Sequence, residues 1–197
     1  MIVVGVTGNL ASGKSEAVKI FKKLGAKVFD ADVAAKQAVK KGKPAYQAIL
    51  KIFGRQYLGK SGELDRKKLA WRVFSNPKDL KKLNILIHPG VIFESLKLIE
   101  RLRKKKGVLV LDVPLLFESK MAELADCTVV VSTRKQKMIA RAAKKGLPAG
   151  LAKKILSTQW PLSKKEHLAD FVIKNNGTTA QLEKEVRWVL NKIQSIH

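Results

Sequence analysis

The sequence predicts an α/β fold of three layers, in which helices cover a five-stranded parallel sheet. Short, continuous apolar segments recur along the chain, and fully buried parallel strands show this pattern rather than an alternating one. Segments with helical hydrophobic spacing separate them, which is typical of β-α-β units. The five predicted strands span residues 2–6, 27–30, 108–112, 127–132 and 170–174.

A glycine-bearing segment links the first predicted strand to the first predicted helix. Residues 8–15 read Gly-Asn-Leu-Ala-Ser-Gly-Lys-Ser, which matches the phosphate-binding motif G-x-x-x-x-G-K-[ST]. Glycines let backbone N–H groups curl around a phosphate, Lys14 reaches the β- and γ-phosphates, and the Ser15 hydroxyl ligates Mg²⁺. We therefore predict a P-loop NTPase core that uses ATP and Mg²⁺. Its expected ATP-binding residues are Gly8, Asn9, Leu10, Ala11, Ser12, Gly13, Lys14 and Ser15.

Carboxylates follow the second and third predicted strands, at Asp30, Asp32 and Asp112. Ligands of open α/β sheets bind at the carboxyl ends of strands. A phosphoryl acceptor needs a carboxylate that orients its hydroxyl and takes the proton, and Asp32 is our candidate for this role. Asp30 or Asp112 is expected to hold Mg²⁺ through water. The structural alternative is that one of the first two aspartates caps the following helix.

A helical region, residues 33–106, separates the second and third predicted strands. Such insertions in nucleotide kinases usually hold the acceptor substrate, although this one could also serve only as packing. Pro89, within this region, predicts a kink or a restart of its helix. Residues 1–32, 107–133 and 159–197 form the rest of the predicted core, with a connecting loop at 159–169.

Residues 134–158 predict two short basic helices separated by Gly-Leu-Pro. Phosphoryl transfer benefits from a mobile cationic lid that excludes water from the transferred group. Arg134 and Arg141 are the guanidinium groups of this segment, and Arg141 is the better candidate for contact with the phosphates. A basic helix that merely faces solvent is the alternative interpretation.

The composition restricts the class of protein. The chain has 197 residues, 40 Lys and Arg against 16 Asp and Glu, and a net charge of +24. This excess favours phosphate-rich ligands or nucleic acid, but most of it is dispersed lysine and no recognition motif supports nucleic-acid binding. The single Cys127 is expected in the core, and a reducing cytoplasm suits it. No apolar stretch is long enough to span a membrane and no signal peptide is evident. His197 is expected at the surface.

Several segments, taken together and in order, resemble dephospho-CoA kinase. They are the phosphate-binding motif with Asp30-Ala31-Asp32, Leu64-Asp65-Arg66-Lys67-Lys68-Leu69, His88-Pro89, Val113-Pro114-Leu115-Leu116-Phe117-Glu118, and Ala169-Asp170-Phe171-Val172-Ile173-Lys174-Asn175. The resemblance implies transfer of the ATP γ-phosphate to the ribose 3′-hydroxyl of dephospho-CoA. It also implies that Asp32 acts on that hydroxyl and that Arg141 belongs to the lid. On the acceptor side it implies His88, Pro114, Leu115, Phe117 and Glu118, and on the ATP side Glu16 and Asn175.

The phosphate-binding segment departs from this family at three positions. The family usually has glycines where Asn9 and Ala11 stand and a threonine where Glu16 stands. Alanine disfavours a positive φ, so the loop is expected to be stiffer. Two other classes remain open at this point: a P-loop kinase with a nucleoside or hydroxy-acid acceptor, and a basic nucleic-acid or NTP-binding module without kinase activity.

Overall fold

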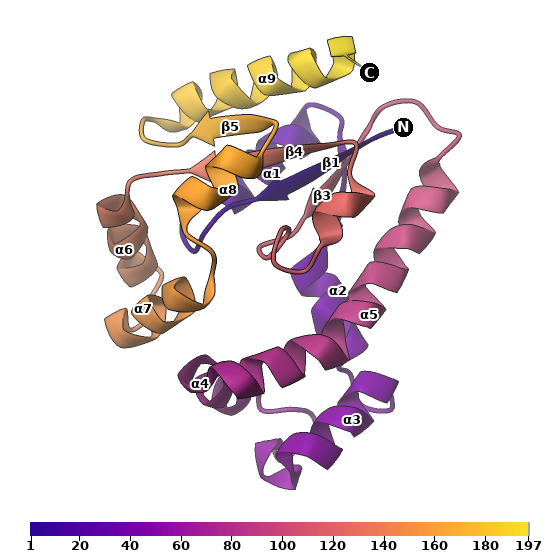
Figure 1. Ribbon diagram of the computed structural model, residues 1–197, viewed down its shortest axis with the longest axis vertical. Helices are drawn as coiled ribbons and strands as arrows, with labels where there is room; N and C mark the ends of the chain where they lie inside the picture. The colour runs from indigo at the N-terminus through magenta and orange to yellow at the C-terminus, as the bar shows by residue number, and fades with distance from the viewer. Residues whose placement is uncertain (197) are drawn as a thin grey trace. The chain divides into compact units, whose positions relative to one another are not determined.

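The structure is a computed structural model that describes residues 1–196. It contains a five-stranded, wholly parallel sheet in the order β2-β3-β1-β4-β5. Figure 1 labels the strands β1, β3, β4 and β5 of this sheet. The strands are β1 (Ile2–Thr7), β2 (Lys27–Asp30), β3 (Val108–Asp112), β4 (Cys127–Ser132) and β5 (Phe171–Lys174). The predicted sheet is confirmed, and β3 and β4 are buried along their whole length, as continuous apolar strands require.

The helices occupy the segments between and after the strands. They are α1 (Lys14–Lys23), α2 (Ala31–Ala38), α3 (Pro44–Phe53), α4 (Arg66–Ser75), α5 (Pro77–Leu102), α6 (Lys135–Lys144), α7 (Ala149–Thr158), α8 (Leu162–Leu168) and α9 (Thr179–Ile196). Two 3-10 turns, η1 (Arg55–Tyr57) and η2 (Met121–Leu124), complete the set. His197 lies outside the described residues.

Two local expectations are corrected by the structure. α5 is one continuous helix through Pro89, so the predicted restart is wrong, whereas the alternative of a kink stays a prediction. Proline removes only one helical hydrogen bond, to the carbonyl of Ile85, and Ile85 is 62% exposed, so water can reach this turn. The predicted connecting loop at 159–169 contains α8, which begins directly after Pro161. Proline is favourable at a helix start because its missing N–H would have had no helical acceptor.

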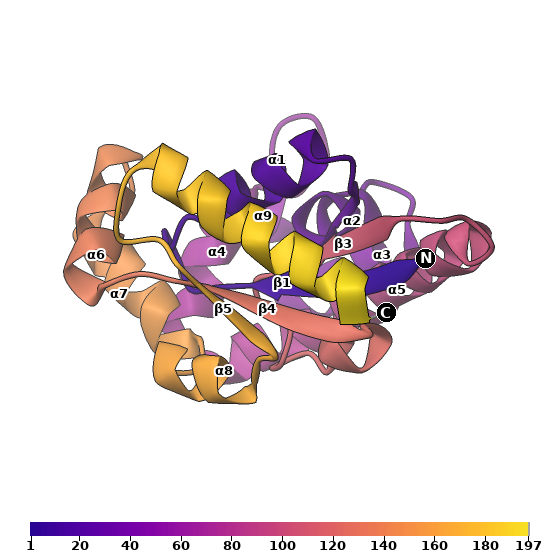
Figure 2. The same cartoon turned by 90° about the horizontal axis from the view of Figure 1, so that it is seen from above.

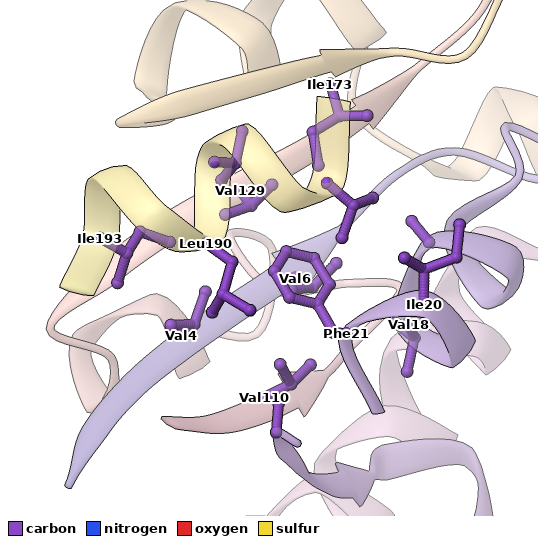
Figure 3. Packing of buried hydrophobic residues seen from close by; sticks show 14 of the residues in the cluster. Val4, Val6, Val18, Ile20, Phe21, Val110, Val129, Ile173, Leu190 and Ile193 are labelled. Carbon is purple, nitrogen blue, oxygen red and sulfur yellow. The ribbon is translucent and has the colours of Figure 1, made fainter. Parts of the chain in front are cut away.

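The chain forms two compact units, one from Met1–Asp30 together with the chain from Leu96 onward, and one from Ala31–Ser95. In the first unit, α9 lies across the strands next to α1 (Figure 2). The ring of Phe21 in α1 is fully buried among aliphatic side chains of the sheet and α9, including Val6, Val110 and Leu190 (Figure 3). This core holds α1 against the sheet, and α1 carries the phosphate-binding segment at its start.

The second unit has a separate helical core. Tyr46, Ile49 and Phe53 of α3 pack with Leu69 and Val73 of α4. Since this unit buries its own apolar residues, it is more than a surface loop of the sheet. No helix within the described residues is long and apolar enough to cross a membrane.

Cys127 lies in the core at the start of β4, as expected, and only 5% of it is exposed. Burial, followed by the negative charges of Asp170 and Asp126, raises the pKa of this thiol to about 12. Burial and nearby carboxylates both disfavour the thiolate. The thiol is therefore an inert part of the core rather than a nucleophile.

We predict that Cys127 in the folded protein reacts very slowly with a disulfide reagent at pH 8, because about one thiol in ten thousand would be ionised at a pKa of about 12. In urea the same thiol should react at the rate of a free cysteine. Above about pH 9 the protein should lose stability, because the unfolded thiol ionises while the folded one does not. Rapid labelling of the native protein would contradict this picture.

Candidate active site

The phosphate-binding segment lies at the carboxyl edge of the sheet. β1 ends at Thr7, and its neighbour Val6 is in register with Asp112 of β3 and Val129 of β4. Asp112 is in turn in register with Asp30 at the end of β2. The parallel pairing therefore brings two of the predicted carboxylates and the phosphate-binding segment to the same edge.

Both glycines of the motif are needed for close approach. A Cβ on Gly8 would lie 2.5 Å from the Ser12 hydroxyl and from the Val131 carbonyl oxygen. Gly13 has a φ of +97°, and a Cβ there would lie 1.8 Å from Nδ2 of Asn175. Alanine cannot replace glycine at either position without moving the loop.

Backbone N–H groups of the loop remain available for a ligand. Within residues 1–196, those of Ala11, Gly13, Lys14 and Ser15 donate to no protein acceptor. The last three lie at the start of α1, where N–H groups have no helical partner and the helix dipole favours an anion. A phosphate is the ligand that this arrangement suits best.

Lys14 forms an ion pair with Asp112 at this edge. Both side chains are largely buried, with 12% and 10% exposed, so the pair is only weakly screened by solvent. Ser15 is exposed in the first turn of α1. A hydroxyl and neighbouring carboxylates are the oxygen ligands that Mg²⁺ uses beside substrate phosphates and water, so these residues fit that ion.

Ser12 is held by a residue of α6, in the predicted lid, and by the residue that follows β5. Its carbonyl accepts hydrogen bonds from Nη1 of Arg141 at 3.2 Å and from Nδ2 of Asn175 at 2.9 Å. Nη2 of Arg141 also donates to the Asn175 carbonyl at 3.3 Å. The structure thus brings the predicted Arg141 and Asn175 to the loop.

A second set of contacts holds the start of the loop. Nδ2 of Asn9 donates to the Trp160 carbonyl at 3.2 Å, and the N–H of Leu10 donates to Oε1 of Gln159 at 3.0 Å. The N–H of Trp160 donates to Oε1 of Glu118 at 3.0 Å. Residues 159 and 160, directly after the predicted lid, therefore contact the loop.

Glu118 forms an ion pair with Lys165 of α8, at 2.8 Å, and Lys165 is fully buried. The ammonium of Lys165 also donates to the Pro114 carbonyl at 3.2 Å, and the Thr7 hydroxyl donates to the same oxygen at 3.0 Å. Glu118 and Pro114 thus have partners within the first unit. Their predicted contact with the acceptor stays a prediction, as it does for Leu115 and Phe117, which are half-buried nearby.

Sequence reasoning missed the contacts of Gln159, Trp160 and Lys165, and it counted Lys165 only as part of the dispersed lysine excess. A signal was available. Pro161 marks a helix start, and residues 162, 165 and 169 then share one face at the i, i+3, i+7 spacing of a buried stripe. That spacing places Lys165, rather than Lys164, toward the interior.

Two other predicted residues belong to the second unit. Asp32 is exposed in the first turn of α2, two residues after the end of β2. His88 lies half-buried in α5, and burial lowers the pKa of its imidazole below the ordinary 6.5. A neutral imidazole can both donate and accept a hydrogen bond.

Comparison with known proteins identifies the family. A family model described as dephospho-CoA kinase matches residues 2–181. The chain belongs to the dephospho-CoA kinase family. Among curated proteins, the dephospho-CoA kinase of Enterococcus faecalis is 36% identical over 196 residues and 97% of both chains. That of Bacillus thuringiensis is 39% identical over 194 residues, covering 97% of this chain and 96% of the relative.

Solved structures agree with this assignment. A dephospho-CoA kinase from Campylobacter jejuni superposes with a TM-score of 0.71 and 29% identity, covering 98% of this chain and 97% of that one. The protein TT1252 from Thermus thermophilus gives a TM-score of 0.79 and 31% identity over 97% of both chains. A shikimate kinase from Bacteroides thetaiotaomicron, at 12% identity and a TM-score of 0.53, shares the fold alone.

The departures from other dephospho-CoA kinases have structural consequences. Ala11 adopts a φ of +59°, the left-handed region that glycine tolerates and alanine disfavours. Asn9 does not take a positive φ and is buried, where its side chain reaches Trp160. Glu16 pairs with Lys19 at 3.3 Å on the exposed side of α1, and its predicted contact with ATP stays a prediction.

We predict that Ala11→Gly leaves the protein as stable or stabilises it by up to about 1 kcal/mol, because relief of the left-handed strain outweighs the greater freedom of glycine in the unfolded chain. Thermal unfolding measures this. The matched control is Ala143→Gly, at an exposed position within α6, which should destabilise by about 1 kcal/mol. Equal losses for the two variants would show that Ala11 is not strained.

Proposed function

We propose that this protein transfers the γ-phosphoryl group of ATP to the ribose 3′-hydroxyl of dephospho-CoA, which completes CoA synthesis. ATP-dependent phosphorylation of dephospho-CoA is the activity of its family, and the family assignment rests on almost the whole chain. The observation that carries the proposal within the structure is the phosphate loop with its unpaired N–H groups. The cytoplasm is the proposed compartment.

The loop and Lys14 would bind the triphosphate. Unpaired N–H groups at the start of α1 donate to phosphate oxygens, and the ammonium of Lys14 neutralises their charge. Because Lys14 pairs with Asp112, it is positioned by a residue of the neighbouring strand before phosphate arrives. We propose that Lys14 then contacts the β- and γ-phosphates.

Mg²⁺ would be held by Ser15 and, through water, by Asp112 or Asp30. The ion supplies positive charge that stabilises the phosphate oxygens during transfer. Arg141 would supply a second positive charge from the proposed lid, residues 134–158. Its contacts with Ser12 and Asn175 already bring the guanidinium to the loop.

The acceptor would bind with help from the helical region, residues 33–106. Asp32 would orient the ribose hydroxyl and accept its proton as the bond to phosphorus forms. The exposed position of Asp32 leaves its carboxylate accessible to a substrate. His88 and the segment from Pro114 to Glu118 are the other proposed acceptor contacts.

Identity of the acceptor is tested by ADP release with ATP and Mg²⁺ in the presence of dephospho-CoA, adenosine, uridine or shikimate. We expect turnover with dephospho-CoA and only the background rate of ATP hydrolysis with the other three. Phosphorylation should occur at the ribose 3′-oxygen, which phosphorus NMR of the product can verify. Preferential turnover of a nucleoside or of shikimate would assign the protein to another group of P-loop kinases.

Asp32→Asn should lower kcat by about two to four orders of magnitude, because asparagine cannot accept the proton of the hydroxyl. Affinity for ATP, measured by titration calorimetry, should stay within about twofold. A suitable control is Glu185→Gln, which likewise removes one exposed carboxylate from a helix and should leave kcat unchanged. An Asp32→Asn variant with normal turnover would place the base elsewhere.

A further inference from the structure

The phosphate-binding segment, or phosphate loop, forms hydrogen bonds near its start with residues that lie outside the motif. Asn9 and Leu10 hydrogen-bond to residues 159–160, which follow the lid. These contacts join positions about 150 apart in the sequence. A contact over such a distance costs chain entropy, so other contacts have to hold residues 159–160 in place.

The anchor is the buried ion pair of Glu118 and Lys165. Glu118 accepts both the N–H of Trp160, at 3.0 Å, and the ammonium of Lys165, at 2.8 Å, on the same oxygen, Oε1. Lys165 is fully buried and Glu118 is 13% exposed. Removing either partner would leave a buried charge without compensation, so the two side chains hold each other and the Trp160 backbone in one arrangement.

Pro114 ties the same anchor to the strand that carries the loop. Its carbonyl accepts the ammonium of Lys165 at 3.2 Å and the hydroxyl of Thr7, the last residue of β1, at 3.0 Å. These contacts connect Thr7, through the Pro114 carbonyl, to Lys165, then to Glu118, to residues 159–160 and to Leu10. The chain from Leu10 back to Thr7 closes the ring of contacts. A closed ring of hydrogen bonds restricts the conformation of the loop more than any single contact could.

We propose that Gln159, Glu118 and Lys165 are positioning residues that keep the phosphate loop in its nucleotide-binding conformation and thereby set the affinity for ATP. This proposal rests on the proposed function only for the identity of the nucleotide. It gives Glu118 a role on the ATP side of the reaction. Lys165 acts through Glu118, with which it forms the buried ion pair.

The main test uses Gln159→Leu, because Gln159 is only half-buried and its loss removes one acceptor without leaving a buried charge. We expect ATP binding, measured by calorimetry without acceptor, to weaken about three- to tenfold, the effect of one hydrogen bond. The matched control is Gln181→Leu, which removes a similar side-chain acceptor, for the N–H of Thr178 at 2.8 Å, from the start of α9. ATP affinity of Gln159→Leu within twofold of that control would overturn the proposal.

The second test compares neighbouring lysines of α8. Lys164→Met removes an exposed ammonium that lies 3.8 Å from the centre of the Trp160 ring, and ATP affinity should change less than twofold. Lys165→Met should weaken ATP binding at least tenfold if it folds, as judged by circular dichroism. Should it fail to fold, Gln159→Leu decides the question.

Steady-state kinetics of Glu118→Gln separate the two possible roles of Glu118. We expect KM for ATP to rise about three- to tenfold, by at least the factor by which KM for dephospho-CoA rises. A rise confined to KM for dephospho-CoA would overturn the positioning role. Because the calorimetric tests need no acceptor, an unmodified protein that binds ATP but does not phosphorylate dephospho-CoA would refute the proposed function alone.

Discussion

The structure depends on a loop in which the N–H groups of Ala11, Gly13, Lys14 and Ser15 have no acceptor within residues 1–196, an arrangement that suits an anion. These residues are exposed or half-buried, so water can solvate their N–H groups, and the loop needs other contacts to keep its conformation. Contacts to other atoms of the same loop, both backbone and side chain, supply this support. Arg141 and Asn175 hold the carbonyl of Ser12, and residues 159–160 hold Asn9 and Leu10. Such support also explains how Ala11 can remain in a left-handed conformation.

The parallel sheet makes this support possible. β1 is the central strand, and its neighbours β3 and β4 end beside it at the same edge. The ends of β3 and β4 therefore lie close to the loop. Asp112 ends β3 and Pro114 follows it, while the chain after β4 leads into α6 with Arg141. β5 then places Asn175 against Ser12. Short polar segments act together because they share a rigid origin.

The sheet and the phosphate loop could be predicted because their signals are local. Apolar strands, intervening helices and the glycine spacing each occupy a few consecutive residues. The contacts that support the loop could not be predicted in this way, because they join Asn9 to Trp160 and Glu118 to Lys165 across long stretches of chain. A lysine in a charged segment is normally solvated. The face of α8 that it occupies becomes evident only when the helix is recognised.

The burial of Lys165 separates two groups of charges that respond differently to ionic strength. The surface carries most of a net charge of +24, and dissolved ions weaken the mutual repulsion of those exposed lysines. Lys165 and Glu118 are shielded from the same ions by the protein. Added salt therefore weakens the repulsion between surface lysines but has little effect on the buried ion pair that holds residues 159–160 beside the phosphate loop.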